Sequence, residues 1–552
     1  MITSTAFFCA GQRSPTGGPP DIVPPEIIET YPHVSSLNFH DRKFRLEFSE
    51  YVDRRSLEES IFISPSLGRL TYDWSGTEVE ISFTDSLRSH TTYIMTIGTD
   101  VVDIRNRNRM EKAFQLPFST GDHIDSASIS GKIYDADPVG VMVFAYGLSD
   151  RDDDTIDPKR AKPDFLSQTG KDGIFVLTNL PLGIFRLIAV RDQYKNLLYD
   201  PQIDRYGISS SDIELTSDKQ SIRGVQIRMS VEDTTAPFLS SARAVDQTHI
   251  LLRFSEEVDM AGDKQSVRIV DTLTNSESAV IEFTFLGESS MEAEIVTAQQ
   301  ESTGTYRVAL EGFRDIHGNE MRSPFNTGIF VGSTQPDTSK PRVTMVTYKD
   351  SNVRAAIDDT LRFTISESIQ KSVFEGGFSI TDSLGQEVKG EFLWGNSTTV
   401  SFPPFPSLLY GMKYTVKVIL DSLIDFSGNR YLDSVWVQHF QTIDERSLGS
   451  IEGNVIDQNE TARDKIFLIV NKVSSKESET HQLVIDTAGT FAFDRIPEGR
   501  YTLFAFRDTD KNRVYSYGKP FPFAWAERFV EYPETLKVRA RWPLEGLLIQ
   551  FK

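Results

Sequence analysis

Two stretches of this chain decide its fold, because one repeats the other. Residues 173–192 read GIFVLTNLPLGIFRLIAVRD, and residues 489–508 read GTFAFDRIPEGRYTLFAFRD. The match continues without a gap to Tyr199 in the first copy and Tyr515 in the second. Ten of the positions that are identical at identical offsets are, in the first copy, Gly173, Phe175, Pro181, Gly183, Ala189, Arg191, Asp192, Lys195, Asn196 and Tyr199. An ungapped match of this length is far beyond chance, so we predict one fold for both segments.

A second, unrelated repeat occurs three times. Its copies begin with Phe48-Ser49-Glu50, Phe254-Ser255-Glu256 and Ile365-Ser366-Glu367, and each is followed by an Asp-rich turn that starts at Asp103, Asp315 or Asp425. An alternating apolar segment precedes each Ser-Glu pair, and a period of two indicates a strand with one buried face. Asp, Gly and Asn suit the tight turns because they tolerate positive φ angles. Short strands at regular spacing predict antiparallel β-sandwiches.

Together the two repeats predict an all-β chain, a tandem array of about five β-sandwiches of ~100 residues each. We call the units with the threefold repeat A1, A2 and A3 and those with the twofold repeat B1 and B2; their order is A1–B1–A2–A3–B2. The expected boundaries are 1–22 for a leader and Gly/Pro-rich tether, 23–122 for A1, 123–232 for B1, 233–335 for A2, 336–443 for A3 and 444–552 for B2. Little linker remains between the units, which predicts a stiff rod.

Composition excludes several classes of protein. The formal charge of −21 argues against nucleic acid as a partner, because a phosphate backbone requires a basic surface. Cys9 is the one cysteine, so no disulfide can form within a monomer. No apolar run approaches the ~20 residues that cross a bilayer. The sequence lacks zinc-peptidase, serine-hydrolase and phosphate-loop motifs, so we do not expect an enzyme.

Both kinds of unit resemble known families. The A units resemble the SbsA-type bacterial Ig-like domain in their Pro-Pro start, their Phe-Ser-Glu segment and turns such as Asp315-Ile-His-Gly-Asn319. The B units, with Gly-x-Phe followed by Pro-x-Gly-x-(Phe/Tyr), resemble the carboxypeptidase regulatory-like, or transthyretin-like, β-sandwich. That domain accompanies metallocarboxypeptidases, but their catalytic zinc domain is missing from this sequence. The resemblance therefore implies β-sandwich modules without peptidase activity.

The N-terminal segment resembles the mature start of Ig-like lipoproteins from Bacteroidetes-like bacteria, in which a cysteine carries the lipid. Cys9 is followed by a Gly/Pro-rich stretch that reaches Pro25. Phe8, however, stands where the lipid-attachment motif has Gly or Ala, and the charged segment that normally precedes the motif is missing, so the start looks truncated. Two interpretations remain. Cys9 is either the lipid attachment site of an outer-membrane lipoprotein, facing the periplasm or the surface, or a free cysteine in a disordered leader.

Oxygen-rich loops are the candidate metal sites. Asp508, Asp510 and Asn512 alternate along one loop of B2, as at the start of a calcium loop. The twelfth position of that loop is Lys519 rather than the acid that completes a calcium loop. The alternative is an Asx turn, in which the Asp and Asn side chains bond only their own backbone.

The acidic residues of each A unit also allow two interpretations, a cation site or a turn. Its Ser-Glu glutamate, such as Glu367, either forms an interdomain cation site with the aspartate of its own turn, such as Asp425, or marks a strand-end turn common to the fold. His317 lies in the A2 turn where A3 has Ser427, so we interpret it as a variable surface residue.

Aromatic clusters are the candidate binding surfaces. Phe521, Phe523 and Trp525 follow the oxygen-rich loop of B2, and Phe405 lies beside a Pro-Pro pair in A3. Exposed, these rings would stack on sugars or on a partner protein; buried, they would pack beneath a long loop. The acidic run at 150–154 is interpreted as a solvated loop.

These observations predict a non-enzymatic protein of a bacterial cell envelope, anchored at its N-terminus, that serves as an extended scaffold, adhesin or assembly factor. Its partner would be an envelope or surface protein or a glycan, with B2 as the distal contact, and Ca²⁺ is the one cofactor considered. The alternative is a carbohydrate- or peptide-binding accessory protein of an uptake or secretion system. That alternative requires a solvent-exposed aromatic platform around Trp525 or Phe405.

Overall fold

The computed structural model describes residues 21–148, 156–259, 266–301, 304–348, 354–459, 462–473 and 479–551. Cys9 and the acidic run at 150–154 lie outside these ranges. Strands dominate the described residues, which confirms the predicted all-β class. The helices there are short: α1 (Arg54–Glu58), α2 (Lys371–Gly377) and the 3₁₀ turns η2 (Leu420–Ser422) and η3 (Glu445–Ser447). None of these helices has the length and apolar character needed to span a membrane.

The first sheets of the three A units have one strand order, and their second sheets share a three-strand core to which A2 and A3 each add one edge strand. In A1 the first sheet is β1 (Ile27–Tyr31), β2 (Lys43–Phe48), β5 (Glu78–Phe83), β4 (Leu70–Ser75), and the second is β3 (Ile61–Ser64), β6 (Thr92–Ile97), β7 (Phe114–Ser119). In A2 the first is β17 (Leu239–Ala244), β18 (His249–Phe254), β23 (Glu292–Thr297), β22 (Val280–Phe285); the second is β21 (Glu277–Ser278), β20 (Ser266–Asp271), β24 (Thr305–Glu311), β26 (Thr327–Val331), and β19 (Val258–Asp259) pairs with β25 (Arg314–Asp315). In A3 they are β27 (Val343–Met345), β29 (Leu361–Ile365), β32 (Thr399–Phe402), β31 (Leu393–Trp394) and then β28 (Arg354–Ala355), β34 (Val435–Thr442), β33 (Lys413–Ile419), β30 (Phe378–Asp382). The threefold sequence repeat is therefore a repeat of one sandwich.

The two B units share their strand order, except that among the described residues the larger sheet of B1 has one further edge strand. The smaller sheet of B1 is β11 (Ile174–Leu180), β8 (Ala127–Tyr134), β15 (Ser221–Arg228), and the larger is β10 (Phe165–Gln168), β9 (Met142–Gly147), β12 (Gly183–Arg191), β13 (Arg205–Ile208), β16 (Ser230–Val231), with β14 (Ile213–Leu215) also on β12. In B2 they are β38 (Thr490–Pro497), β35 (Leu448–Asp457), β42 (Pro543–Phe551) and then β37 (Thr480–Ile485), β36 (Lys465–Lys472), β39 (Gly499–Asp508), β40 (Phe529–Glu531), with β41 (Leu536–Val538) also on β39. In both units the first strand pairs in parallel with a strand near the end of the unit: β8 with β15 and β35 with β42.

The twofold repeat also matches at single residues. Its Pro-x-Gly turn joins β11 to β12 in B1 and β38 to β39 in B2. Lys195 and Lys511, at matched positions, both have a positive φ, of 54° and 62°. Few non-glycine residues adopt this conformation, so its recurrence shows that the turn after the shared strand is the same. One fold for both segments is confirmed.

Alternating apolar residues form the sandwich cores. On β2, Phe44, Leu46 and Phe48 are buried while Arg45 faces solvent. The equivalent buried residues are Ile250, Leu252 and Phe254 on β18 and Leu361, Phe363 and Ile365 on β29. Full burial of each such side chain stabilises the fold by about 1.5–3 kcal/mol, so the period-two pattern fixes which face of each strand turns inward.

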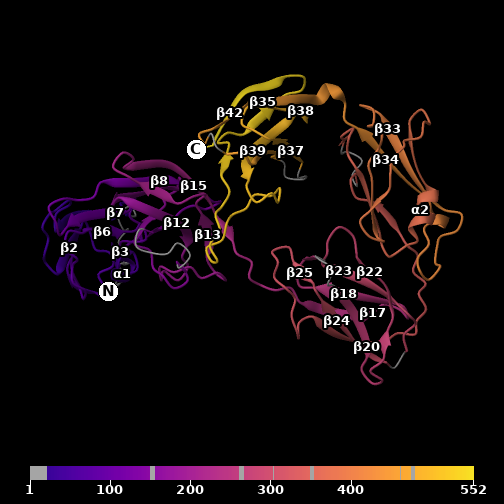
Figure 1. Ribbon diagram of the computed structural model, residues 1–552, viewed down its shortest axis with the longest axis horizontal. Helices are drawn as coiled ribbons and strands as arrows, with labels where there is room; N and C mark the ends of the chain where they lie inside the picture. Colours follow the sequence, from indigo (N-terminus) through magenta and orange to yellow (C-terminus); the bar gives the residue numbers. More distant parts are fainter. Residues whose placement is uncertain are drawn as a thin grey trace, which may run out of the picture.

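The units do not form the straight rod that the short linkers predicted. In Figure 1 the chain curves, so that the yellow B2 unit lies beside the indigo and magenta A1–B1 end while A2 and A3 lie on the opposite side. The loop between β39 and β40, residues 509–528, reaches B1. There the Tyr206 hydroxyl donates a hydrogen bond of 2.9 Å to the Gly518 carbonyl. The rod prediction fails because it considered only contacts between successive units.

Candidate functional site

The first candidate site is the contact between the 509–528 loop of B2 and B1, which closes the chain. The guanidinium of Arg186, on β12, lies 3.8 Å from the ring centroid of Phe523 and 5.2 Å from that of Trp525. The rings of Phe523 and Trp525 meet edge to face with their centroids 4.7 Å apart. The ammonium of Lys159 lies 4.8 Å from the ring centroid of Phe521. The three predicted binding-surface residues of B2 thus all lie against cations of B1.

Arg186 is held in place for this contact. Its side chain is 4% exposed, and its Nε and Nη2 donate to the Oδ1 and Oδ2 of Asp212 at 3.1 and 3.0 Å. A bidentate pair fixes the plane of a guanidinium, and a desolvated cation over an aromatic face contributes about 2 kcal/mol. The matched position in B2 is Thr502. At this position of the twofold repeat, therefore, only B1 has a positively charged side chain.

Apolar contacts extend the closure on both sides of Arg186. Ala526 and Phe523 pack into a B1 cluster that contains Phe144, Tyr146, Tyr199 and Tyr206. Tyr134 of β8 meets Phe529 of β40 edge to face at 5.2 Å. The guanidinium of Arg228, on β15, lies 4.4 Å from the ring centroid of Phe504. B2 is therefore held to B1 by a patch on each of the two B1 sheets.

The predicted aromatic platforms retain some access to solvent. Trp525 is 41% exposed despite its contact with B1, and Phe405 of A3 is 80% exposed. Phe521 and Phe523 are half-buried. Binding of a sugar or a partner protein to these rings stays a prediction.

The second candidate site is the oxygen-rich loop of B2. Carboxylate oxygens of Asp508, Asp510 and Glu527 lie within 4.8 Å of one another. Asn512 is adjacent, but its Nδ2 donates to the Oδ2 of Asp510 at 2.9 Å and its Oδ1 accepts from the Val514 N–H at 2.7 Å. The structure thus groups two of the three predicted donors with Glu527. Spacing within the loop could not reveal Glu527, because it lies beyond the aromatic segment.

These acids also accept hydrogen bonds from the loop itself. Asp508 accepts from the Arg513 N–H at 3.2 Å, Asp510 from the Asn512 N–H at 3.1 Å, and Glu527 from the Ser516 N–H at 3.1 Å. Burial raises the pKa of the Glu527 carboxyl, and the backbone N–H groups only partly offset that shift. The loop has the hydrogen bonds of the Asx interpretation. Calcium binding there stays a prediction.

The third candidate site is an acidic junction at the start of each A unit. A linker aspartate, the Ser-Glu glutamate and the turn aspartate approach one another: Asp21, Glu50 and Asp103 in A1; Asp233, Glu256 and Asp315 in A2; Asp337, Glu367 and Asp425 in A3. The turn is also a strand end, as the alternative interpretation held, because its aspartate forms a β-bridge in each unit. An asparagine amide of each turn donates to the linker carbonyl, at 3.0, 3.0 and 3.2 Å. The turn therefore ties the unit to the preceding linker.

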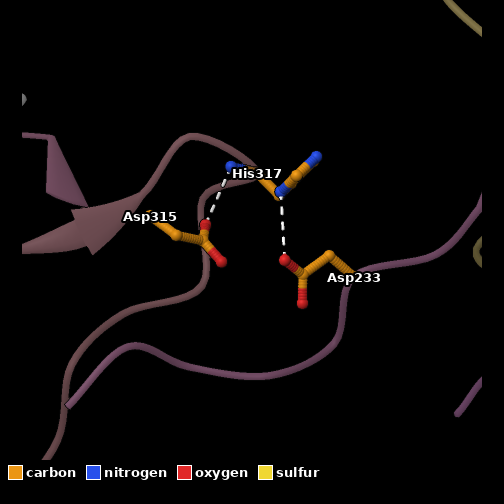
Figure 2. A group of neighbouring side chains, drawn as sticks. All are labelled: Asp233, Asp315 and His317. Atoms are coloured by element: carbon orange, nitrogen blue, oxygen red, sulfur yellow. Dashed lines mark hydrogen bonds and ion pairs between the residues drawn. The ribbon is translucent and has the colours of Figure 1, made fainter. Parts of the chain in front are cut away.

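In A2 an imidazole belongs to this junction. Figure 2 shows the ring of His317 beside Asp233, with Nδ1 3.2 Å from the Asp233 Oδ2, while the His317 N–H donates to the Asp315 Oδ1 at 2.8 Å. The ring is exposed, as expected, but it also makes an ion pair when protonated. The equivalent residue of A3, Ser427, has no such group.

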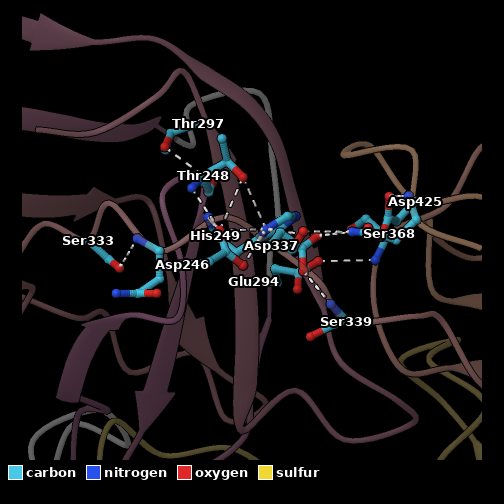
Figure 3. Close-up of polar contacts among 12 residues, drawn as sticks. Asp246, Thr248, His249, Glu294, Thr297, Ser333, Asp337, Ser339, Ser368 and Asp425 are labelled. Atoms are coloured by element: carbon cyan, nitrogen blue, oxygen red, sulfur yellow. Dashed lines mark hydrogen bonds and ion pairs between the residues drawn. The ribbon is translucent and has the colours of Figure 1, made fainter.

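A buried charged cluster joins A2 to A3 (Figure 3). The Nδ1 of His249, on β18, lies 2.9 Å from the Asp246 Oδ2 and 3.9 Å from the Asp337 Oδ2. Burial alone would lower the pKa of His249, but the hydrogen bond and charge of Asp246, with the charges of Glu294 and Asp337, raise it to about 9. Across the junction, the Ser368 N–H donates to the Glu294 Oε2 at 3.1 Å. Sequence reasoning missed this cluster, because a lone histidine carries no pattern of its own.

Comparisons with known proteins agree with the sandwich fold. The bacterial Ig-like domain family matches residues 21–120 and 337–442, which correspond to A1 and A3. No curated protein matches the chain. The N-terminal part of the bacterial S-layer protein SbsC aligns at 16% identity and a TM-score of 0.17, over 37% of this chain and 44% of that one. The N-terminal four Ig domains of Dscam1 align at 9% identity and a TM-score of 0.19, over 77% of this chain and 100% of that one. Scores this low carry no functional argument, and the chain spans less than half of the SbsC fragment.

Proposed function

We propose that this chain is a non-enzymatic scaffold protein of a bacterial cell envelope, with SbsA-type Ig-like A units and transthyretin-like B units. The two bacterial Ig-like matches support the envelope assignment, and the Gly-x-Phe and Pro-x-Gly motifs support the B units. The observation that carries the scaffold function is the contact of B2 with B1. It joins the last unit to the second one and so holds A2 and A3 between two fixed points.

Closure gives the chain a defined geometry that linkers alone cannot give. Neighbouring domains move relative to one another unless their interface is large and apolar. Here the A2–A3 junction has its own polar contacts: Thr398 Oγ1 donates to the Phe285 carbonyl at 2.7 Å in a partly buried position, and Arg362 lies 2.8 Å from Glu288 at the exposed rim. With both ends of the A2–A3 pair held, partners bound to different units would be kept at set distances.

The structure changes the role expected for B2. A free distal module could be removed without consequence for the other units. B2 instead covers Tyr134 and Arg186 of B1. We therefore expect deletion of residues 445–552 to expose an apolar face of B1 and to lower its stability, as well as to remove any partner site on B2.

Lipid attachment at Cys9 is the anchor that this proposal favours. The test is to express the chain from its native locus, fractionate the cells and take the mass of the N-terminal peptide, with Cys9→Ala as the matched variant. We expect the wild-type chain in the membrane fraction with a diacylglyceryl group on Cys9, and the variant in the soluble fraction. A wild-type chain that is soluble in the cytoplasm with an unmodified peptide would refute the envelope assignment.

A further inference from the structure

The three acidic junctions are internal copies, so the way each one compensates its charge can be compared. In A1 the buried carboxylate of Asp103 accepts four backbone N–H groups: those of Arg105, Asn106, Arg107 and Asn108. In A2 the carboxylate of Asp315 accepts from two backbone N–H groups and from the Asn319 amide, and His317 faces the linker aspartate. Each of these two junctions satisfies its turn aspartate with groups of its own.

A3 gives its turn aspartate fewer hydrogen bonds. Asp425 is fully buried, its Oδ1 accepts from the Asn429 N–H at 2.7 Å, and within the described part of the chain its Oδ2 has no partner at hydrogen-bond distance. In A2 the Asn319 amide donates to the turn aspartate at 2.8 Å, whereas the short hydrogen bond of the matching Asn429 amide, of 2.9 Å, goes to the Oδ2 of the linker residue Asp337. Ser427 replaces the imidazole of His317. An unpaired buried carboxylate oxygen is costly, so the junction is incomplete as it stands.

The neighbouring groups add negative charge to this site. One carboxylate oxygen from each of Asp337, Glu367 and Asp425 lies within 4.8 Å of the others. The side chain of Asp337 is 3% exposed, and Glu367 is 8% exposed. His249 faces Asp337, but it is already paired with Asp246, and Glu294 adds a further carboxylate. Burial, followed by the charges of Asp425 and Asp337, raises the pKa of Glu367 to about 8.

We propose that Asp337, Glu367 and Asp425 bind a divalent cation at the junction of A2 and A3, and that this cation is Ca²⁺. The donors are all carboxylate oxygens, the ligands that Ca²⁺ prefers, and Ca²⁺ accepts irregular sets of six to eight oxygens completed by water and backbone carbonyls. Zn²⁺ favours nitrogen and sulfur ligands. Because Asp337 belongs to the linker while the other two belong to A3 turns, the ion fixes the start of A3 beside the Ser368–Glu294 contact with A2. The proposed Ca²⁺ site does not rest on the proposed function of the protein as an envelope scaffold.

The test is calorimetric titration of CaCl₂ into the metal-free full chain carrying Asp510→Asn, a background in which the B2 loop is impaired as a calcium site. In that background we expect one Ca²⁺ to bind, and we expect Glu367→Gln to weaken its affinity at least about tenfold, because one of three carboxylates is lost. The matched control is Glu256→Gln, the same position in A2, which should leave the affinity unchanged. An absence of binding in the Asp510→Asn background, or equal affinity with and without Glu367→Gln, would overturn the site.

A second variant separates loss of the site from loss of the fold. Ser427→His introduces the imidazole of A2 at an exposed position of A3, where it should pair with Asp337 and weaken Ca²⁺ binding without disturbing the core. Ca²⁺ should raise the midpoint of thermal unfolding of the parent chain and not that of Glu367→Gln, while near-ultraviolet circular dichroism in EGTA should be alike for all variants. If the calcium affinity were unchanged in both Ser427→His and Glu367→Gln, the cluster would not bind Ca²⁺, and protonation of its carboxyl groups would explain how its charge is reduced.

Discussion

The contact between Phe523 and Arg186 should determine how tightly the chain is closed. Phe523→Ala removes a desolvated cation–π contact of about 2 kcal/mol. It also removes more than half of the 1.5–3 kcal/mol that a fully buried Phe contributes, because most of the residue is buried. The sum is about 3 kcal/mol, which corresponds to a roughly hundredfold lower ratio of closed to open chains.

Hydrogen exchange of the loop at 509–528 measures this ratio, because its amides exchange from the open state and the exchange rate therefore scales with the fraction of open chains. Peptides from this loop should exchange roughly a hundredfold faster in Phe523→Ala than in the wild-type chain. Phe405→Ala, which removes an 80% exposed ring from A3, is the matched control and should leave the loop unchanged. Loop exchange that stays within about twofold of wild type in Phe523→Ala would refute the closure energetics.

Two further predictions concern the B2 core. The buried carboxylate of Asp457 lies 2.6 Å from both Arg507 and Arg528, so Asp457→Asn should lower the free energy of unfolding at pH 7 by about 3–5 kcal/mol. Burial raises the pKa of Asp457, but hydrogen bonds from Arg528, a backbone N–H and Arg507 outweigh burial, so the pKa in the folded chain lies below its usual value. The stabilisation is therefore present above the unfolded pKa of about 3.9 and is lost as the pH falls through the folded pKa. Urea unfolding at a series of pH values would show this loss. Gly453→Ala would place Cβ 2.4 Å from the Leu547 carbonyl oxygen between β35 and β42, and thermal unfolding should show a cost of about 1–3 kcal/mol.

The fold supplies two comparisons for the glycine substitution. Gly131 occupies the equivalent place in B1, where Cβ would lie 2.1 Å from the Val225 carbonyl oxygen, so Gly131→Ala should destabilise B1 similarly. Gly376 in α2 has open space at the Cβ position, and Gly376→Ala should be tolerated. An Asp457→Asn chain whose difference from wild type is the same at pH 7 and pH 3 would contradict the ion-pair account.

The architecture within each unit was predictable because its signals are local. The period-two apolar residues of β2 and its sister strands fixed strand faces, and the ungapped repeat around Gly183 and Gly499 fixed a shared turn. The turn aspartate of A3, Asp425, also lies beside the Ser-Glu glutamate of the same unit, Glu367, which is one of the two arrangements that the sequence allowed. These features depend on neighbours within one sandwich, and a repeat displays them more than once.

The contacts between distant units were not predictable in the same way. Phe523 meets Arg186 across more than 300 residues of sequence, and nothing in either segment names the other. Glu527 joins Asp508 only because the intervening loop folds back. One signal did exist: Arg186 breaks the match with B2, where Thr502 stands, and a charged residue amid an apolar strand requires a partner.

Site-specific crosslinking at Phe521 shows whether B2 closes onto B1. Replacing Phe521 by the photoreactive p-benzoylphenylalanine keeps an aromatic ring at the position beside Lys159. In dilute full-length protein, the account predicts a crosslink within one chain to the B1 segment that contains Lys159, identified by mass spectrometry of the peptides. A chain that crosslinks only within B2, or only to a second molecule, would contradict the closed structure and leave the units as a rod.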